Sequence, residues 1–295
     1  MPYAWSDGTA YPTGLRISAL CFGTWEIGGL FWGQVDQYDG VNLLRRALEL
    51  GVTTFDTADV YGNGRSEVLL SVAFHGRRQD VVYISKAGYL VGLDGAQAVR
   101  MRPEIGGRDR DHSPAYLRWA LELSLRRLNT DYIDVWLLHD PPQEVLASQE
   151  VWECLRELQR HGKIRYYGAS TSARGGIVAI EQGGAQVIEV PFNLLQQEAA
   201  AELFPLAKAR GIGILARTPF AGGRLFRGGP QVEPFAFLFR QAGGPAQAAL
   251  KYVLSHDTVA AVVTGIMREQ ELEENIAACA PPYFDAATLQ RAAAV

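Results

Sequence analysis

Short apolar segments alternate with amphipathic segments along most of the chain. The apolar segments have the length of buried strands and comprise residues 19–23, 52–56, 81–86, 133–138, 166–170, 187–192, 213–217 and 259–264. A helical spacing of apolar residues marks the segments 40–50, 66–74, 114–128, 150–161, 173–182, 200–210, 245–256 and 270–278, the last of which is expected to end the fold. Because parallel strands need crossover connections, usually helices, this alternation predicts an α/β fold, a parallel (β/α)₈ TIM barrel with its active site at the C-terminal face of the strands.

The length of the chain fits one barrel. Barrels of this kind use about 250 residues as a single domain, so we expect residues 1–295 to form one domain. A doubly wound parallel sheet is the alternative, but no Gly-x-Gly-x-x-Gly pattern follows the first predicted strand. Two connections, 87–113 and 218–244, are longer than a barrel requires, and long connections are often functional.

The composition excludes several classes of partner. Hydrophobic residues make up 48% of the chain and charged residues 20%, and the net charge of −4 offers no basic surface to a nucleic acid or an anionic membrane. No apolar run reaches the roughly 18–20 residues of a membrane span, and the first residues carry no targeting signal. Three widely separated cysteines argue against a disulfide framework and a closed zinc site. We therefore predict a cytoplasmic protein without a metal, a nucleic-acid partner or a membrane partner, and the oligomeric state stays open.

Polar residues that suit proton transfer stand at the ends of three successive predicted strands. Asp56 ends one strand and Tyr61 follows five residues later, Lys86 ends the next strand, and His139 ends the third. A phenol with a pKa near 10 is a poor proton donor at neutral pH unless a cation stabilises its phenolate. The carboxyl ends of barrel strands lie on one face, so we expect these four side chains to meet there.

These four residues and several further stretches resemble the aldo-keto reductase superfamily, in its bacterial-type branch. The supporting stretches are 23–25, 56–58 with 61–62, 125–134, 162–165, 168–170, 192–195, 219–223 and 273–275. The resemblance implies an NAD(P)-dependent oxidoreductase that reduces an aldehyde or ketone by hydride transfer, or oxidises a sugar or polyol hydroxyl. It makes Tyr61 the general acid and base, with Lys86 lowering the pKa of the phenol, Asp56 pairing with the lysine, and His139 orienting the carbonyl oxygen.

The resemblance also implies the residues that contact the cofactor and the substrate. The cofactor residues are Gly23, Thr24, Trp25, Asp56, Ser170, Thr171, Glu189, Arg217, Thr218, Pro219, Phe220, Gly222, Arg224, Gly265, Arg268, Glu271, Glu274 and Asn275. The substrate pocket is expected to include Trp25, Trp32, Tyr61, Tyr89 and His139. Arg217 stands where many relatives have an aromatic residue, and its planar guanidinium is expected to lie flat against the nicotinamide.

Two departures from the family pattern affect the cofactor. Thr171 replaces a usual asparagine, and Glu189 replaces the glutamine that usually meets the nicotinamide carboxamide. A carboxylate accepts hydrogen bonds only, so Glu189 can bind the amide NH₂ but cannot donate to the amide oxygen. At the expected 2′-phosphate site Met267 replaces a frequent arginine, Glu271 is acidic and Arg268 is the remaining cation. Family habit favours NADP(H), and the charges keep NAD(H) as the alternative.

Two other functions are weighed against this one. Some members of the superfamily serve as non-catalytic, nicotinamide-cofactor-binding regulatory subunits, and they keep the same four residues. A metal-dependent barrel hydrolase or isomerase would need a ligand cluster, and none with convincing spacing is found in the sequence. The sequence indicates a small-molecule carbonyl or alcohol substrate but does not name it.

Overall fold

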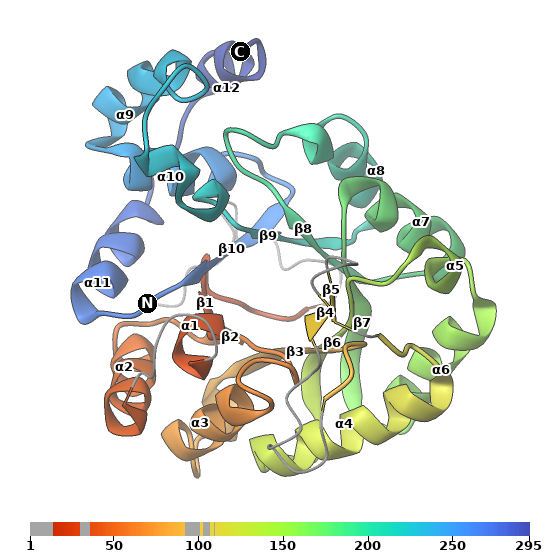
Figure 1. Ribbon diagram of the computed structural model, residues 1–295. Helices are drawn as coiled ribbons and strands as arrows, with labels where there is room; N and C mark the ends of the chain where they lie inside the picture. The colour runs from red at the N-terminus through yellow and green to blue at the C-terminus, as the bar shows by residue number, and fades with distance from the viewer. Residues whose placement is uncertain (1–13, 30–35, 92–100, 103–106, 109) are drawn as a thin grey trace.

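A computed structural model describes residues 14–29, 36–91, 101–102, 107–108 and 110–295, and shows a closed barrel of eight parallel strands (Figure 1). The strands follow one another in the order β1, β2, β3, β6, β7, β8, β9, β10, and β10 pairs with β1. Their bounds are β1 Leu20–Gly23, β2 Thr54–Asp56, β3 Val82–Ala87, β6 Ile133–His139, β7 Ile164–Ser170, β8 Val187–Pro191, β9 Gly213–Arg217 and β10 Val259–Gly265. The predicted single-domain (β/α)₈ barrel is confirmed.

Helices surround the barrel, as Figure 1 shows. Those that match predicted segments are α2 Gln37–Glu49, α3 Arg65–Ala73, α4 Pro114–Leu128, α6 Gln149–Arg160, α7 Ala173–Gly183, α8 Leu203–Arg210, α10 Pro245–Leu254 and α11 Glu269–Ala278. The start of α4 shows how local sequence sets these bounds: Ser113 Oγ accepts a hydrogen bond from Tyr116 N at 3.3 Å, and Pro114 occupies the first helical position. The helix ends at Asn129, whose φ of 50° is left-handed.

The structure contains short elements that the hydrophobic pattern did not predict. They are α1 Trp25–Gly28, η1 Arg78–Asp80, the paired strands β4 Met101–Arg102 and β5 Gly107–Arg108, α5 Gln143–Leu146, η3 Glu198–Ala200, η4 Ala221–Phe226, η5 Glu233–Phe235, α9 Ala236–Ala242 and α12 Ala286–Ala293. The predicted helix 200–210 begins instead at Leu203, after η3. The prediction that 270–278 ends the fold is wrong, because α12 follows it. That helix is only 8 residues long, and Asp285 caps it by accepting from Thr288 N at 2.8 Å.

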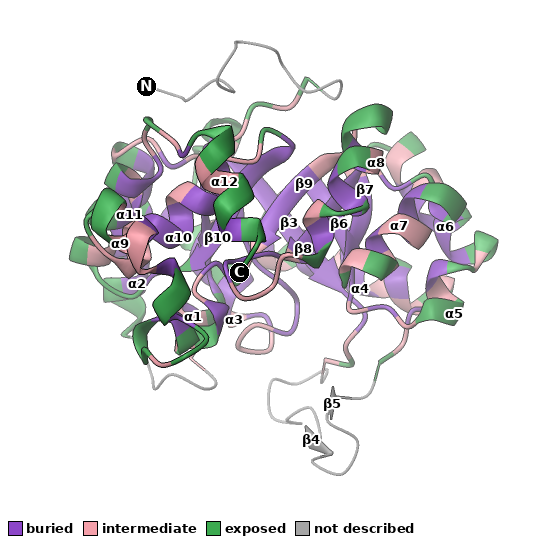
Figure 2. Cartoon of the chain, turned by 90° about the horizontal axis from the view of Figure 1, so that it is seen from above, coloured by how far each residue is buried: buried purple, intermediate pink, exposed green. Residues whose placement is uncertain are grey.

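The core has two layers, inside and outside the sheet. Side chains from alternating positions fill the barrel interior, among them Cys21, Ile84, Val135 and Leu215. A larger cluster packs the outer face of the strands against the helices. Figure 2 shows the buried strands enclosed by helices whose outer faces are exposed. Within the described residues, no helix combines the length and the apolar character that a membrane crossing would need.

Candidate active site

The ends of neighbouring strands bring the predicted polar residues to one face of the barrel. In the strand pairing, Gly23 lies opposite Asp56, and Ser170 lies opposite both His139 and Glu189. Lys86 is the next-to-last residue of β3. Because all eight strands run in parallel, these residues surround the same end of the barrel, where the loops after the strands supply the remaining groups.

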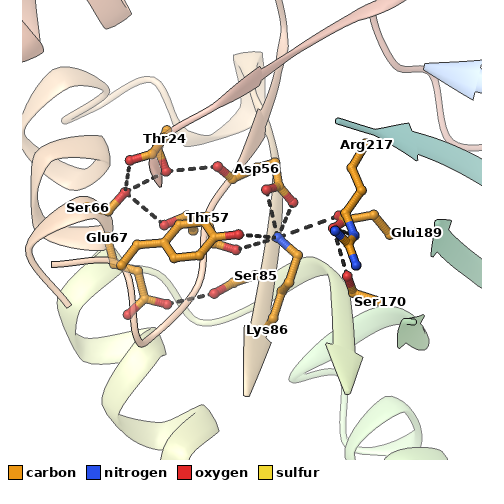
Figure 3. Close-up of polar contacts among 11 residues, drawn as sticks. Thr24, Asp56, Thr57, Ser66, Glu67, Ser85, Lys86, Ser170, Glu189 and Arg217 are labelled. Carbon is orange, nitrogen blue, oxygen red and sulfur yellow. Dashed lines mark hydrogen bonds and ion pairs between the residues drawn. The ribbon is translucent and has the colours of Figure 1, made fainter. Parts of the chain in front are cut away.

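Lys86 is fully buried at the centre of a hydrogen-bond array (Figure 3). Its Nζ donates to Asp56 Oδ1 at 2.7 Å and Oδ2 at 2.5 Å, to the carbonyl oxygen of Thr57 at 3.0 Å, and to Tyr61 Oη at 3.4 Å. Burial alone would lower the pKa of Lys86, but Asp56 and Glu189 raise it above its usual value. Lys86 therefore stays a cation beneath the phenol.

The phenol of Tyr61 differs in one respect from the expectation drawn from the sequence. Lys86 acts to lower the pKa of Tyr61, as expected. Burial raises that pKa by more, however, and the charges of Asp56 and Glu189 add to the increase, so the net shift is upward. The net shift is thus opposite to the predicted lowering. Tyr61 keeps its proton at neutral pH, as a proton donor requires.

A close backbone contact fixes the turn that carries Tyr61. Gly62 has a φ of +63°, and a Cβ at this position would lie 2.4 Å from the carbonyl oxygen of Gly28. The last turn of α1 therefore packs directly on the Tyr61–Gly62 backbone. The rings of Trp25 and Tyr61 are 5.1 Å apart, so α1 also supports the phenol from one side. Only glycine combines this conformation with this approach.

Hydroxyl groups hold the loop after β2 beneath the site (Figure 3). Thr24 Oγ1 donates to the carbonyl oxygen of Asp56 at 2.8 Å and accepts from Ser66 Oγ at 2.5 Å. Thr57 Oγ1 donates to Ser66 Oγ at 3.0 Å. Thr24 was predicted to contact the cofactor, but its side chain is fully buried in this network and does not line the cavity. The network instead positions Asp56, and Ser66 was not predicted to take part.

His139 is a buried, neutral imidazole. Its ring meets the rings of Tyr89 and Tyr61 edge-on, with centroids 4.7 and 6.0 Å away. Burial lowers the pKa of His139 well below its usual value, and the cations Lys86 and Arg217 lower it further. Its Nδ1 is buried and has no hydrogen-bond partner among the described residues. Tyr89, which reaches His139, donates from its hydroxyl to Asp140 Oδ2 at 2.6 Å.

Glu189 is a second buried carboxylate next to Lys86 (Figure 3). Its Oε2 lies 3.5 Å from Lys86 Nζ, and its Oε1 accepts from Ser170 Oγ at 2.8 Å and lies 3.8 Å from Arg217 Nε. Burial acts to raise the pKa of Glu189, but Lys86 and Arg217 outweigh it and hold the pKa below its usual range. Glu189 is therefore an anion at neutral pH.

A cavity of about 590 Å³ opens among these groups. Predicted site residues on its wall are Gly23, Trp25, Asp56, Tyr61, His139, Ser170, Glu189, Arg217, Thr218, Pro219, Phe220, Gly222 and Gly265. Gly223, in the stretch 219–223 that resembles the family, is also on the wall, and the wall residues that were not predicted are Glu26, Asp140, Phe226, Val263 and Thr264. Thr171, Arg224, Arg268, Glu271, Glu274 and Asn275 do not line it. Trp32 lies outside the described residues.

Glu26 is the acidic wall residue that the sequence analysis missed. A Cβ on Gly265 would lie 2.0 Å from both carboxyl oxygens of Glu26, so this carboxyl group lies directly on the end of β10. Burial raises the pKa of Glu26, and the nearby Glu271 adds to the increase. The sequence carried one signal for Glu26. It directly follows Thr24 and Trp25, two predicted cofactor contacts, and was therefore a candidate for a third contact.

The residues expected at the adenosine end interact with one another. Arg268 donates to Glu271 Oε1 through Nε at 2.9 Å and Nη2 at 2.5 Å, and Met267 N donates to Glu271 Oε2 at 3.0 Å. Asn275 Nδ2 donates a buried hydrogen bond to Thr264 Oγ1 at 3.4 Å. A phosphate at this place would compete with Glu271 for the guanidinium of Arg268.

The sequence pattern of the Aldo/keto reductase family matches residues 19–294. The chain belongs to this family. The prediction of an NAD(P)H-dependent oxidoreductase of the aldo-keto reductase type is thereby confirmed, and NADP(H) is the cofactor that the family uses.

Several similar proteins align with almost the whole length of this chain. The oxidoreductase YqkF of Bacillus subtilis (strain 168) is 30% identical over 287 residues, which span 90% of this chain and 88% of YqkF. Aldo-keto reductase AKR11C1 from Bacillus halodurans, solved in its holo form, has a TM-score of 0.80 and 29% identity, covering 96% of this chain and 94% of its own. An aldo-keto reductase from Klebsiella pneumoniae in complex with NADPH has a TM-score of 0.74 and 25% identity, covering 96% and 92%.

Proposed function

We propose that this aldo-keto reductase reduces an aldehyde or ketone with NADP(H), or oxidises a sugar or polyol hydroxyl in the reverse direction, with Tyr61 as general acid and base. The observation that carries the proposal is the Asp56–Lys86–Tyr61 array, with His139 beside it, on the wall of one cavity. The similar aldo-keto reductase from Klebsiella pneumoniae, solved in complex with NADPH, supports the cofactor.

The cavity wall fits a nicotinamide cofactor. Glu189 Oε2 and Arg217 Nε are buried polar atoms without hydrogen-bond partners among the described residues, and both side chains line the cavity. With Ser170 they would hold the nicotinamide end, and the glycine-containing segment around Gly222 would pass the pyrophosphate. When bound, the cofactor supplies or accepts the hydride.

Tyr61 handles the proton of the reaction. During carbonyl reduction the substrate oxygen gains negative charge and Tyr61 Oη donates its proton to it. Lys86 Nζ, 3.4 Å from Oη, then stabilises the phenolate, and Asp56 keeps Lys86 charged and in place. Positioned acid catalysis of this kind typically contributes about 10²–10⁴-fold to the rate. In the reverse direction the same phenolate removes the proton of the hydroxyl.

His139 would orient the substrate oxygen. Because its imidazole is neutral, it can donate one hydrogen bond without competing with Tyr61 as an acid. Its contact with Tyr89, which is tied to Asp140, limits rotation of the ring. Trp25 and Phe220 would form the apolar part of the substrate wall.

The preference between the two cofactors depends on Arg268. We propose NADP(H), because the family uses it. NAD(H) is the alternative, because Arg268, the cation at the expected 2′-phosphate position, is shared with Glu271. Side-by-side fluorescence titration with NADPH and NADH, repeated on Glu271→Arg, distinguishes them. NADPH binding that weakens in Arg268→Ala supports NADP(H), whereas NADH preference that reverses in Glu271→Arg supports NAD(H).

The experiment that tests the function combines this titration with turnover on panels of aldehydes, ketones, sugars and polyols. Binding together with turnover supports an oxidoreductase. Binding without turnover on any panel member would instead favour the non-catalytic regulatory subunit. Failure to bind either cofactor would contradict the cofactor assignment and the oxidoreductase function with it.

A further inference from the structure

Glu189 is a charged group on the cavity wall. Proton transfer by Tyr61 does not require it. Its side chain is buried, with one oxygen held by Ser170 Oγ at 2.8 Å. The other oxygen makes no hydrogen bond to any residue that the structure describes and lies 3.5 Å from Lys86 Nζ. The cavity wall thus includes a buried carboxyl group with one oxygen that retains hydrogen-bonding capacity.

The cations near Glu189 are already shared with other carboxylates. Lys86 makes its two shortest contacts to Asp56. Arg217 lies between two acids, with Nη2 3.6 Å from Asp140 Oδ1 and Nε 3.8 Å from Glu189 Oε1. Three carboxylates therefore surround two cations in this group. A glutamine at position 189 would remove one carboxylate from this group and leave both cations in place, so the glutamate adds one acid to this part of the wall.

We propose that Glu189 is a specificity-determining residue that favours the oxidised form of the nicotinamide cofactor over the reduced form. The nicotinamide ring carries a positive charge only when it is oxidised, so an added carboxylate at this end of the cavity stabilises that form selectively. The inference rests on the proposed function, which assigns the nicotinamide to this wall. In a partly desolvated site, one unit charge changes the affinity for another by on the order of tenfold or more.

The same charge has a consequence for the catalytic cycle. By stabilising the oxidised form, Glu189 makes loss of hydride from the bound reduced form more favourable. It also slows the release of the oxidised cofactor after carbonyl reduction. A neutral side chain at position 189 would weaken both effects, and it would also remove a charge that raises the pKa values of Lys86 and Tyr61.

Isothermal titration calorimetry of the full chain with the oxidised and reduced cofactors, each added separately, tests the inference without turnover. Glu189→Gln removes the charge but keeps the size of the side chain, and we expect it to weaken binding of the oxidised form relative to the reduced form by on the order of tenfold. Glu189→Asp keeps the charge and should leave the ratio of the two dissociation constants within about threefold of the wild-type ratio.

Glu26→Gln is the matched control, because Glu26 lines the same cavity but lies on Gly265. It should change the affinity for both forms by a similar factor. An unchanged ratio in Glu189→Gln overturns the inference and leaves the proposed function standing, whereas wild-type protein that binds neither form overturns the proposed function itself. If Glu189→Gln does not melt cooperatively, the wild-type ratio decides: tighter binding of the oxidised form supports the inference, and reduced-form binding tighter by about tenfold overturns it.

Discussion

Lys86 donates from one ammonium to both carboxylate oxygens of Asp56, at 2.7 and 2.5 Å, with both side chains buried. Breaking a buried ion pair leaves the other charge without its partner, which is strongly unfavourable. Among the residues that the structure describes, Lys86 is also the cation that donates a hydrogen bond to Tyr61 Oη. The pair therefore links the stability of the barrel to the chemistry of its active site.

Removing the charge of Asp56 should destabilise the protein and impair turnover together. We expect Asp56→Asn to lower the free energy of unfolding by about 3 kcal/mol, because Lys86 stays buried with only the more distant Glu189 as a charged partner. Urea denaturation measures this change. The matched control is Asp257→Asn, which removes a partner of Lys208 on the exposed surface and should have little effect. Equal effects of the two substitutions would contradict the assigned importance of the buried pair.

The acid sensitivity of the fold should depend on His139. Its pKa is lowered in the folded protein, so below the unfolded value of about 6.5 the unfolded chain takes up a proton that the folded chain does not. Unfolding therefore becomes easier as the pH falls, by up to about 1.4 kcal/mol for each pH unit until the folded pKa is reached. His139→Gln should make the acid side of a stability-against-pH curve shallower. Identical slopes for the variant and the wild type would show that His139 is not the buried, neutral group described.

Contact between α1 and the turn after β2 should be essential for placing Tyr61. Gly62→Ala introduces a Cβ 2.4 Å from the carbonyl oxygen of Gly28, in addition to an unfavourable φ of +63°. Gly76→Ala is the matched control, because Gly76 has a φ of +74° with open space around it. We expect Gly62→Ala to lower the free energy of unfolding by about 2 kcal/mol more than the control, which carries only the backbone cost of about 1 kcal/mol. Urea denaturation of both variants provides the comparison, and equal losses would remove the steric explanation.

Much of the barrel follows from the sequence because the strands are short apolar runs, and β2, β6, β7 and β9 end in polar residues. The sequence alone predicts that Asp56, Lys86 and His139 lie on one face of the barrel, since the carboxyl ends of parallel barrel strands share one face. Short helices such as α9 and α12 span too few residues to show a helical period reliably, so their caps and tertiary contacts decide them.

Parts of the site depend on side-chain packing, which the spacing of residues along the sequence does not predict. Thr24 stands beside Gly23 in the sequence, yet its hydroxyl turns into a buried network with Asp56 and Ser66 instead of the cavity. The net upward shift of the Tyr61 pKa likewise depends on how deeply the phenol is buried, which the spacing of residues does not reveal. Motif spacing predicted which groups meet, whereas their exposure and charge balance required the structure.

The most direct test of the account is turnover by Tyr61→Phe alongside calorimetric titration of the cofactor. Loss of the phenolic proton should lower kcat by about 10²–10⁴-fold while the dissociation constant for the cofactor changes little. Tyr83→Phe is the control, because it removes another buried hydroxyl that lies outside the cavity. Full activity in Tyr61→Phe would contradict the assignment of Tyr61 as the proton donor, and loss of cofactor binding in parallel with turnover would show that the residue serves binding instead.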